Sequence, residues 1–140
     1  MSSSAKNRSD LGHWVCGEEV SEDAYGFVYK ITNKTDKKFY IGKKQILSKR
    51  KLPPLKGKKR KRTVLKESDW KTYTGSSDNL NADIERLGKD AFMFEIVKIC
   101  CSKSELAYFE TKLQFDLDVL LKEEFYNGII NCRIGKIKLS

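Results

Sequence analysis

The sequence predicts an α+β fold, in which helices flank a small antiparallel sheet of three strands. Three short runs rich in β-branched and aromatic residues, 27–31, 38–42 and 92–99, are the expected strands. Two stretches with apolar residues at helical spacing, 77–88 and 102–120, are the expected main helices. The length of 140 residues fits one domain with a single core.

The first two strands are expected to form a hairpin. They are joined by Asn33-Lys34-Thr35-Asp36, and these residue types favour a tight turn. The pairing places Tyr29 and Tyr40 side by side. The preceding residues, 1–24, show weak periodicity, and we expect them to form an N-terminal extension to a domain that covers 25–140, with a basic insertion at about 49–66.

Positive charge is concentrated in one segment. Residues 43–66 contain twelve Lys or Arg and no Asp or Glu, whereas the rest of the chain sums to −3, so this segment accounts for the net charge of +9. Such a distribution is typical of a surface that contacts phosphate backbones, and a merely solvated or nuclear-localisation-like run is the alternative. We expect a short helix over 43–51 that stops near Pro53-Pro54, and then a basic loop over 56–62. The candidate nucleic-acid-binding residues are Lys44, Lys49, Lys51, Lys56, Lys58, Lys59, Arg60, Lys61 and Arg62.

The second half of the chain begins with a helix whose start and end are both marked. Ser76 or Ser77 is the expected N-cap, and Gly88 is the expected end. The inner face of this helix carries Leu80, Ile84 and Leu87. The third strand follows, and because it is apolar at most positions we expect it to be central or packed on both faces.

The last helix carries an acid within its apolar stripe. Ser102-Lys103-Ser104-Glu105 fits a capping box at its start. The stripe consists of Leu106, Phe109, Leu113, Leu117 and Leu120. Glu110 falls inside it, and burying a carboxylate there is costly unless a metal ion or an arginine compensates. Glu110 is therefore a candidate metal ligand, with a structural acid that reaches solvent or pairs with Lys or Arg as the alternative.

Composition excludes several other classes. No apolar run approaches the roughly 18 residues of a transmembrane helix, and the start of the chain lacks the apolar stretch of a secretory signal, so we expect a cytoplasmic protein with no membrane partner. Four cysteines without regular spacing predict reduced thiols. A zinc site built from His13, Cys16, Cys100 and Cys132 is conceivable, but the adjacent Cys100 and Cys101 would point to opposite faces of a strand.

The paired tyrosine strands, the basic segment after them and the lone acid on a later helix resemble the GIY-YIG nuclease superfamily, most strongly its phage-encoded free-standing and homing endonucleases. Gly26-Phe27-Val28-Tyr29 stands for the first motif and Tyr40-Ile41-Gly42 for the second. Arg50 lies ten residues beyond Tyr40, where the family has an arginine on its first helix. Glu110 matches the family's metal-binding glutamate, and Asn127 matches its late asparagine.

One family position is missing. The His or Tyr expected about a turn after the arginine falls at Pro54. Tyr73, Lys43 or Lys44 is the candidate replacement, and the choice among them stays open.

The resemblance implies a metal-dependent DNA endonuclease, similar to homing endonucleases, that hydrolyses phosphodiester bonds with one Mg²⁺ or Mn²⁺ ion. It implies that Glu110 holds this ion, that Tyr29 is the general base, that Arg50 neutralises transition-state charge and that Tyr40 orients water or phosphate. A phenol with a pKa of about 10 needs nearby cations to act as a base at neutral pH. The implied partner is double-stranded DNA, bound by a monomer or weak dimer, in the host cytoplasm if the gene is carried by a phage.

Two other functional classes are alternatives. The first is a non-catalytic nucleic-acid-binding protein on the same scaffold, which the missing His or Tyr favours and the retained Arg50 and Glu110 oppose. The second is an interaction protein that docks a partner through Tyr108 and Phe115, and this alternative leaves the basic segment unexplained.

Overall fold

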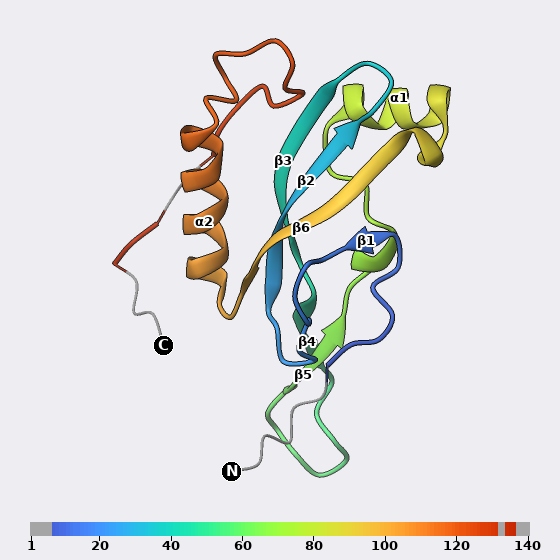
Figure 1. The fold of residues 1–140 in the computed structure, drawn as a ribbon. Helices are drawn as coiled ribbons and strands as arrows, with labels where there is room; N and C mark the ends of the chain where they lie inside the picture. Colours follow the sequence, from blue (N-terminus) through green and yellow to red (C-terminus); the bar gives the residue numbers. More distant parts are fainter. Residues whose placement is uncertain (1–6, 132–133, 137–140) are drawn as a thin grey trace.

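The computed structural model describes residues 7–131 and 134–136 and confirms the α+β class (Figure 1). The strands form a twisted sheet, with the longest helix on one face and the shorter helix on the opposite side. Within this described part of the chain, no helix is both long enough and apolar enough to cross a bilayer.

The main sheet has the order β1-β6-β2-β3. Strand β2, Gly26–Asn33, pairs antiparallel with both β3, Lys38–Gln45, and β6, Phe92–Cys100, so the three predicted strands are confirmed. The sequence did not reveal β1, Trp14–Val15, which pairs in parallel with β6. Strand β6 therefore lies inside the sheet, as expected.

The β2–β3 turn is closed by one side chain. The Asn33 Oδ1 accepts the backbone N–H groups of Thr35 at 3.0 Å and Asp36 at 2.9 Å. This is the local bonding for which asparagine is favoured in turns. In the resulting register Tyr29 lies opposite Gly42, and Ile31 opposite Tyr40.

Both main helices begin at the predicted caps. Helix α1, Asp78–Leu87, has Ser77 as N-cap, whose hydroxyl accepts from the Leu80 N–H, and it ends at Gly88 with φ of 86°. Helix α2, Lys103–Asp116, starts at Ser102, whose Oγ accepts from the Glu105 N–H at 3.1 Å. Two short 3₁₀ helices, η1 and η2, span Trp70–Thr72 and Lys89–Ala91.

The predicted length of the last helix is wrong. Helix α2 ends at Asp116, and Asp118 adopts a left-handed φ of 54°. This reversal buries Val119 and leaves Leu120 48% exposed, so Val119 takes the core position expected for Leu120. The hydrophobic spacing continued beyond the helix because the turn that follows also contributes to the core.

The predicted helix over 43–51 is also wrong. Strand β3 continues to Gln45, and β4, Leu47–Leu52, pairs antiparallel with β5, Arg62–Glu67, in a separate two-stranded sheet. The extended form is stabilised by pairing with 62–67, a segment outside the stretch from which the helix was predicted. The connecting residues 53–61 are exposed, as expected for a basic loop. We call β4, β5 and 53–61 together the ribbon.

Apolar side chains are buried on both faces of the main sheet. One cluster lies under α1 and η1 and includes Trp14 and Val20 of the expected N-terminal extension, which packs against the domain over this stretch. The other lies under α2 and includes Val28, Ile41 and Leu106. Each face of the hairpin is thus fixed by its own core.

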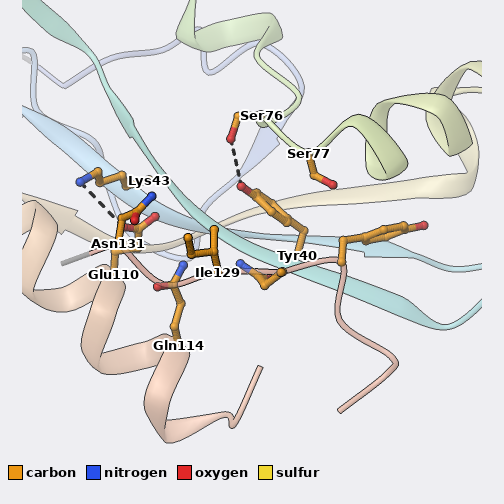
Figure 2. Close-up of a pocket in the computed structure, with 11 residues that line it drawn as sticks. Tyr40, Lys43, Ser76, Ser77, Glu110, Gln114, Ile129 and Asn131 are labelled. Carbon is orange, nitrogen blue, oxygen red and sulfur yellow. Dashed lines mark hydrogen bonds and ion pairs between the residues drawn. The ribbon is translucent and has the colours of Figure 1, made fainter. Parts of the chain in front are cut away.

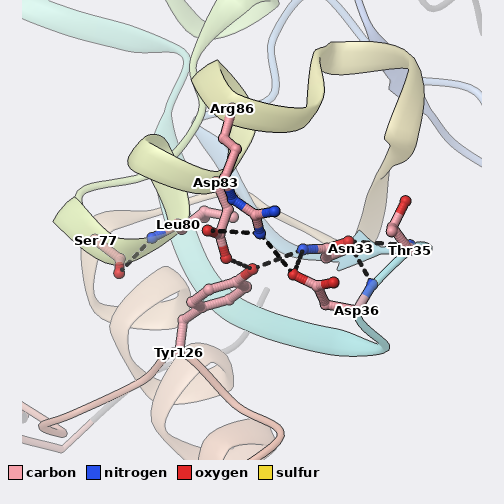
Figure 3. A network of polar contacts seen from close by, with 8 residues as sticks. All are labelled: Asn33, Thr35, Asp36, Ser77, Leu80, Asp83, Arg86 and Tyr126. Atoms are coloured by element: carbon pink, nitrogen blue, oxygen red, sulfur yellow. Dashed lines mark hydrogen bonds and ion pairs between the residues drawn. The ribbon is translucent and has the colours of Figure 1, made fainter.

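A polar network ties the hairpin turn to α1 and to the segment after α2 (Figure 3). The Tyr126 hydroxyl donates to Asp83 at 2.7 Å and accepts from the Asn33 amide at 3.0 Å. The Arg86 guanidinium bonds Asp36 at 2.8 Å and Asp83 at 3.2 Å. These contacts fix the position of Tyr126 and of the residues that follow it.

Candidate active site

A pocket of about 450 Å³ opens between β3, α2, the start of α1 and the segment after Tyr126 (Figure 2). It is lined by Tyr40, Lys43, Ser76, Ser77, Glu110, Gln114, Tyr126, Asn127, Gly128, Ile129 and Asn131. Four of the predicted site residues, Tyr40, Lys43, Glu110 and Asn127, therefore meet at one place.

Glu110 reaches this pocket from the middle of α2. Its side chain is 13% exposed, and the Lys43 Nζ lies 3.8 Å from its Oε1. Burial raises the pKa of Glu110 above its ordinary value, and Lys43 opposes that rise. The predicted position of an acid beside the apolar face is thus confirmed, and its ion pair is long and leaves the carboxylate open to the pocket.

Three phenols gather beside this acid. The Tyr40 hydroxyl lies 3.2 Å from the Ser76 Oγ at the pocket wall. The Tyr29 ring lies 6.1 Å from the ring of Tyr40 and 6.2 Å from that of Tyr73. Tyr29 is only 1% exposed, and burial, with smaller contributions from Tyr40, Tyr73 and Glu110, raises its pKa well above 10. Burial also raises the pKa values of Tyr40 and Tyr73.

Two glycines make room for these rings because they lack a side chain. A side-chain carbon at Gly42 would overlap the Tyr29 hydroxyl and come within 2.9 Å of the Tyr40 ring. One at Gly75, where φ is 85°, would come within 3.2 Å of both residues. The glycine of the Tyr40-Ile41-Gly42 motif is therefore required by the phenol on the neighbouring strand.

Asn127 is held by the backbone of β3. Its side-chain oxygen accepts the Ile41 N–H at 3.0 Å, and its amide donates to the Ile41 carbonyl at 2.7 Å. Gln114 donates to the same carbonyl at 3.1 Å. The Asn127 side chain therefore pairs like an additional strand residue and fixes the pocket wall against β3.

Replacing Asn127 with Ala is expected to lower the free energy of unfolding by about 2 kcal/mol, because the buried Ile41 N–H loses its side-chain acceptor. The measurement is urea unfolding followed by circular dichroism. Asn131→Ala, an exposed side chain at the same pocket, is the control and should leave the midpoint unchanged. An unchanged midpoint for Asn127→Ala would contradict the structural role.

The other predicted residues whose side chains are described do not line the pocket. The helix expected to carry Arg50 is absent, since Arg50 lies on β4 opposite Val64; the side chains of Lys49 and Arg50 lie outside the described residues. Lys44 contacts Asp69 at 2.8 Å and lies 4.1 Å from the centre of the Tyr73 ring. The other candidate nucleic-acid-binding residues of the ribbon, Lys51, Lys56, Lys58, Lys59, Arg60, Lys61 and Arg62, are exposed.

Sequence reasoning missed several pocket residues. Ser76, Gln114 and Asn131 line it, and the only signal for any of them was the cap role considered for Ser76. Among the described residues no group of three or more His, Cys, Asp or Glu side chains could hold a metal ion, while Cys132 of the zinc alternative lies outside the described residues.

A tyrosine-bearing hairpin and a glutamate on a later helix, grouped at one pocket, are the arrangement expected of a GIY-YIG nuclease domain. The family model described as "Putative endonuclease segE, GIY-YIG domain" matches residues 13–130. Because this match covers most of the chain, the protein belongs to that family of GIY-YIG endonucleases, and its substrate is a nucleic acid. Searches of curated proteins and of solved structures found no match. The resemblance read from the sequence is confirmed, and the two non-nuclease alternatives are disfavoured.

Proposed function

We propose that this endonuclease hydrolyses phosphodiester bonds of double-stranded DNA with one bound Mg²⁺ ion, for which Glu110 is the protein ligand. One observation carries the proposal: the Glu110 carboxylate is largely buried yet lines the open pocket beside Tyr40 and Lys43. A carboxylate in such a place is stabilised by a cation, and the one described ammonium near it lies 3.8 Å away.

The oxygen donors that line the pocket suit magnesium. The pocket offers one carboxylate and the hydroxyls of Tyr40, Ser76 and Ser77, which are hard oxygen donors. Magnesium retains several waters and is commonly bound by one or two carboxylates together with substrate phosphate, so no larger ligand cluster is needed. When bound, the ion would polarise the phosphate and offset negative charge in the transition state.

The chain's own groups have distinct proposed roles. Lys43 lines the pocket and is placed to contact a phosphate oxygen, and Tyr40 is placed to orient the attacking water. Tyr29 lies behind Tyr40, and its raised pKa keeps its hydroxyl protonated near neutral pH. Tyr29 can therefore act as the general base only if bound cations lower this pKa, because a nearby positive charge favours the phenolate.

Removing divalent cations is expected to abolish cleavage. Supercoiled plasmid incubated with the protein in 10-fold excess EDTA should stay intact, while Mg²⁺ should restore nicking in proportion to its occupancy of one site. The measurement is the initial rate of nicked-circle formation on an agarose gel. Equal rates in EDTA and Mg²⁺ would overturn metal dependence.

Two further expectations remain predictions: that the protein acts as a monomer or weak dimer, and that it selects its target in the manner of a homing endonuclease.

The ribbon is expected to supply phosphate contacts. Changing Lys58, Lys59 and Lys61 together to Ala should make the slope of log K against log salt shallower by up to about 2.7, because each lost phosphate contact releases about 0.9 fewer counterions. The measurement is fluorescence anisotropy of a labelled duplex at several salt concentrations. A triple change of exposed lysines outside the ribbon, Lys34, Lys103 and Lys122, is the control, and an equal effect of both triples would count against the assignment.

A further inference from the structure

The ribbon is a separate element that extends away from the main sheet (Figure 1). Six residue pairs join its strands, from Leu47 opposite Glu67 to Leu52 opposite Arg62. It forms its own two-stranded sheet and shares no strand pairing with the main sheet among the described residues. Its position is fixed at its base, where the Glu67 carboxylate accepts from Arg8 at 2.9 Å and from Trp70 at 2.7 Å.

Strand β5 of the ribbon has no core to pack against. All six side chains of β5 are exposed, including the apolar Leu65 at 65% and Val64 at 36%. An isolated two-stranded hairpin is only marginally stable in water, and strands without a buried face gain little from burial. A strand pair that exposes apolar and basic side chains together is better explained by a ligand that contacts both kinds of atom.

The dimensions of the ribbon match the major groove of B-form DNA. Two paired strands lie about 4.8 Å apart, and six residues span about 20 Å. The major groove of B-form DNA, about 12 Å wide, admits a two-stranded ribbon, whereas the minor groove is about 6 Å wide. The major groove of A-form RNA is too deep and narrow for side chains to read. We propose that the ribbon enters the major groove of duplex DNA, an inference that rests on DNA being the substrate.

Of the two faces of the paired strands β4 and β5, only one carries an acidic side chain. Along β5 side chains alternate, so Arg62, Val64 and Lys66 share one face, while Thr63, Leu65 and Glu67 share the other. The second face carries the acid that bonds the protein body. The first face combines two cations with an apolar side chain, which suits phosphate, guanine edges and thymine methyl groups. It is therefore the face turned toward the base pairs.

Two double variants with the same change in net charge test this face. Arg62→Ala with Lys66→Ala removes two charges from the groove-facing side, and Thr63→Glu with Leu65→Glu removes two units of net charge on the opposite side. Binding to a labelled 30-bp DNA duplex in EDTA should weaken about tenfold or more for the first pair and by less than about threefold for the second. Circular dichroism checks that both variants are folded. Equal weakening by the two pairs would overturn the assignment of the face.

The groove itself is tested with the unaltered protein. A duplex whose pyrimidines carry bulky C5 substituents, which project into the major groove, should bind about tenfold more weakly, and so should an RNA duplex of the same sequence. A saturating minor-groove ligand should leave binding unchanged. Unchanged affinity for the C5-modified duplex or the RNA duplex, or displacement by the minor-groove ligand, would overturn the proposal.

These binding assays are independent of cleavage. If the protein nicks plasmid with Mg²⁺ but ignores the C5 substituents, the ribbon inference fails and the proposed function stands. If it shows the groove dependence but does not nick DNA with Mg²⁺, the proposed metal-dependent cleavage fails, while duplex DNA as the bound nucleic acid and the ribbon inference stand.

Discussion

Replacing Glu110 with Gln is expected to lower the Mg²⁺-dependent nicking rate by about a thousandfold or more. The amide has the shape of the carboxylate but no charge, so it cannot hold the proposed cation in the pocket, and the loss of a metal ion's charge stabilisation is worth several kcal/mol. DNA retention should stay nearly unchanged because the exposed ribbon lysines Lys58, Lys59 and Lys61 do not line the pocket. The measurement is the plasmid-nicking rate beside the anisotropy of a labelled duplex.

A matched change on the same helix is the control. Asp116→Asn neutralises an exposed carboxylate of α2 that pairs with Lys112 and does not line the pocket, so its nicking rate should equal that of the unaltered protein. If Glu110→Gln keeps more than about a tenth of the activity, the carboxylate does not hold the cation and the proposed site is wrong.

The pH dependence of nicking follows from the same carboxyl group. Because burial raises the pKa of Glu110, protonation removes its charge at a higher pH than for an exposed glutamate. Activity should therefore fall as pH decreases through that raised pKa, and more Mg²⁺ should shift the fall to lower pH because cation and proton compete for one carboxylate. The same nicking assay, repeated across pH at several Mg²⁺ concentrations, measures this competition. If the pH at which activity falls does not change with Mg²⁺ concentration, Glu110 is not the ligand.

Replacing Gly42 with Ala is expected to damage both stability and activity. The added methyl group would overlap the Tyr29 hydroxyl and crowd the Tyr40 ring, so both phenols must move. Overpacking of this kind costs about 1–3 kcal/mol of unfolding free energy, and misplacing catalytic groups by about 1 Å costs about a hundredfold in rate. Urea unfolding and plasmid nicking measure the two effects.

Gly17 provides the comparison for this change. A side-chain carbon at Gly17 meets no atom within 4 Å, so Gly17→Ala should leave both the unfolding midpoint and the nicking rate unchanged. If Gly42→Ala also leaves both unchanged, the close packing of Tyr29 on β3 has no functional consequence, and the arrangement of the phenols must be revised.

Local signals predicted most of the scaffold. Turn residues around Asn33, the cap at Ser102 and the glycine at Gly88 each specify a boundary through a bond or dihedral angle formed within a few residues. The position of Glu110 within the apolar stripe was equally predictable, because helical spacing alone places it beside the core. These features depend on near neighbours in the chain, and a single sequence contains them.

The features that sequence missed depend on distant partners. Nothing within 43–52 shows that this segment pairs with 62–67, and without that partner the helix was a reasonable prediction. The burial of Tyr29 depends on Gly42 and Gly75, and the role of Asn127 depends on the backbone of Ile41. The site was thus predicted as a set of residues, but the packing of the half-buried Tyr40 ring against the fully buried Tyr29 was not predicted.

The most direct test of the account is a crystal structure of the protein soaked with Mn²⁺, whose anomalous scattering locates the ion. The account predicts a peak about 2.1–2.3 Å from a Glu110 carboxylate oxygen, within the pocket bounded by Tyr40 and Lys43, and no such peak in Glu110→Gln. A Glu110 carboxylate that stays paired with Lys43 while the ion binds elsewhere or nowhere would contradict it.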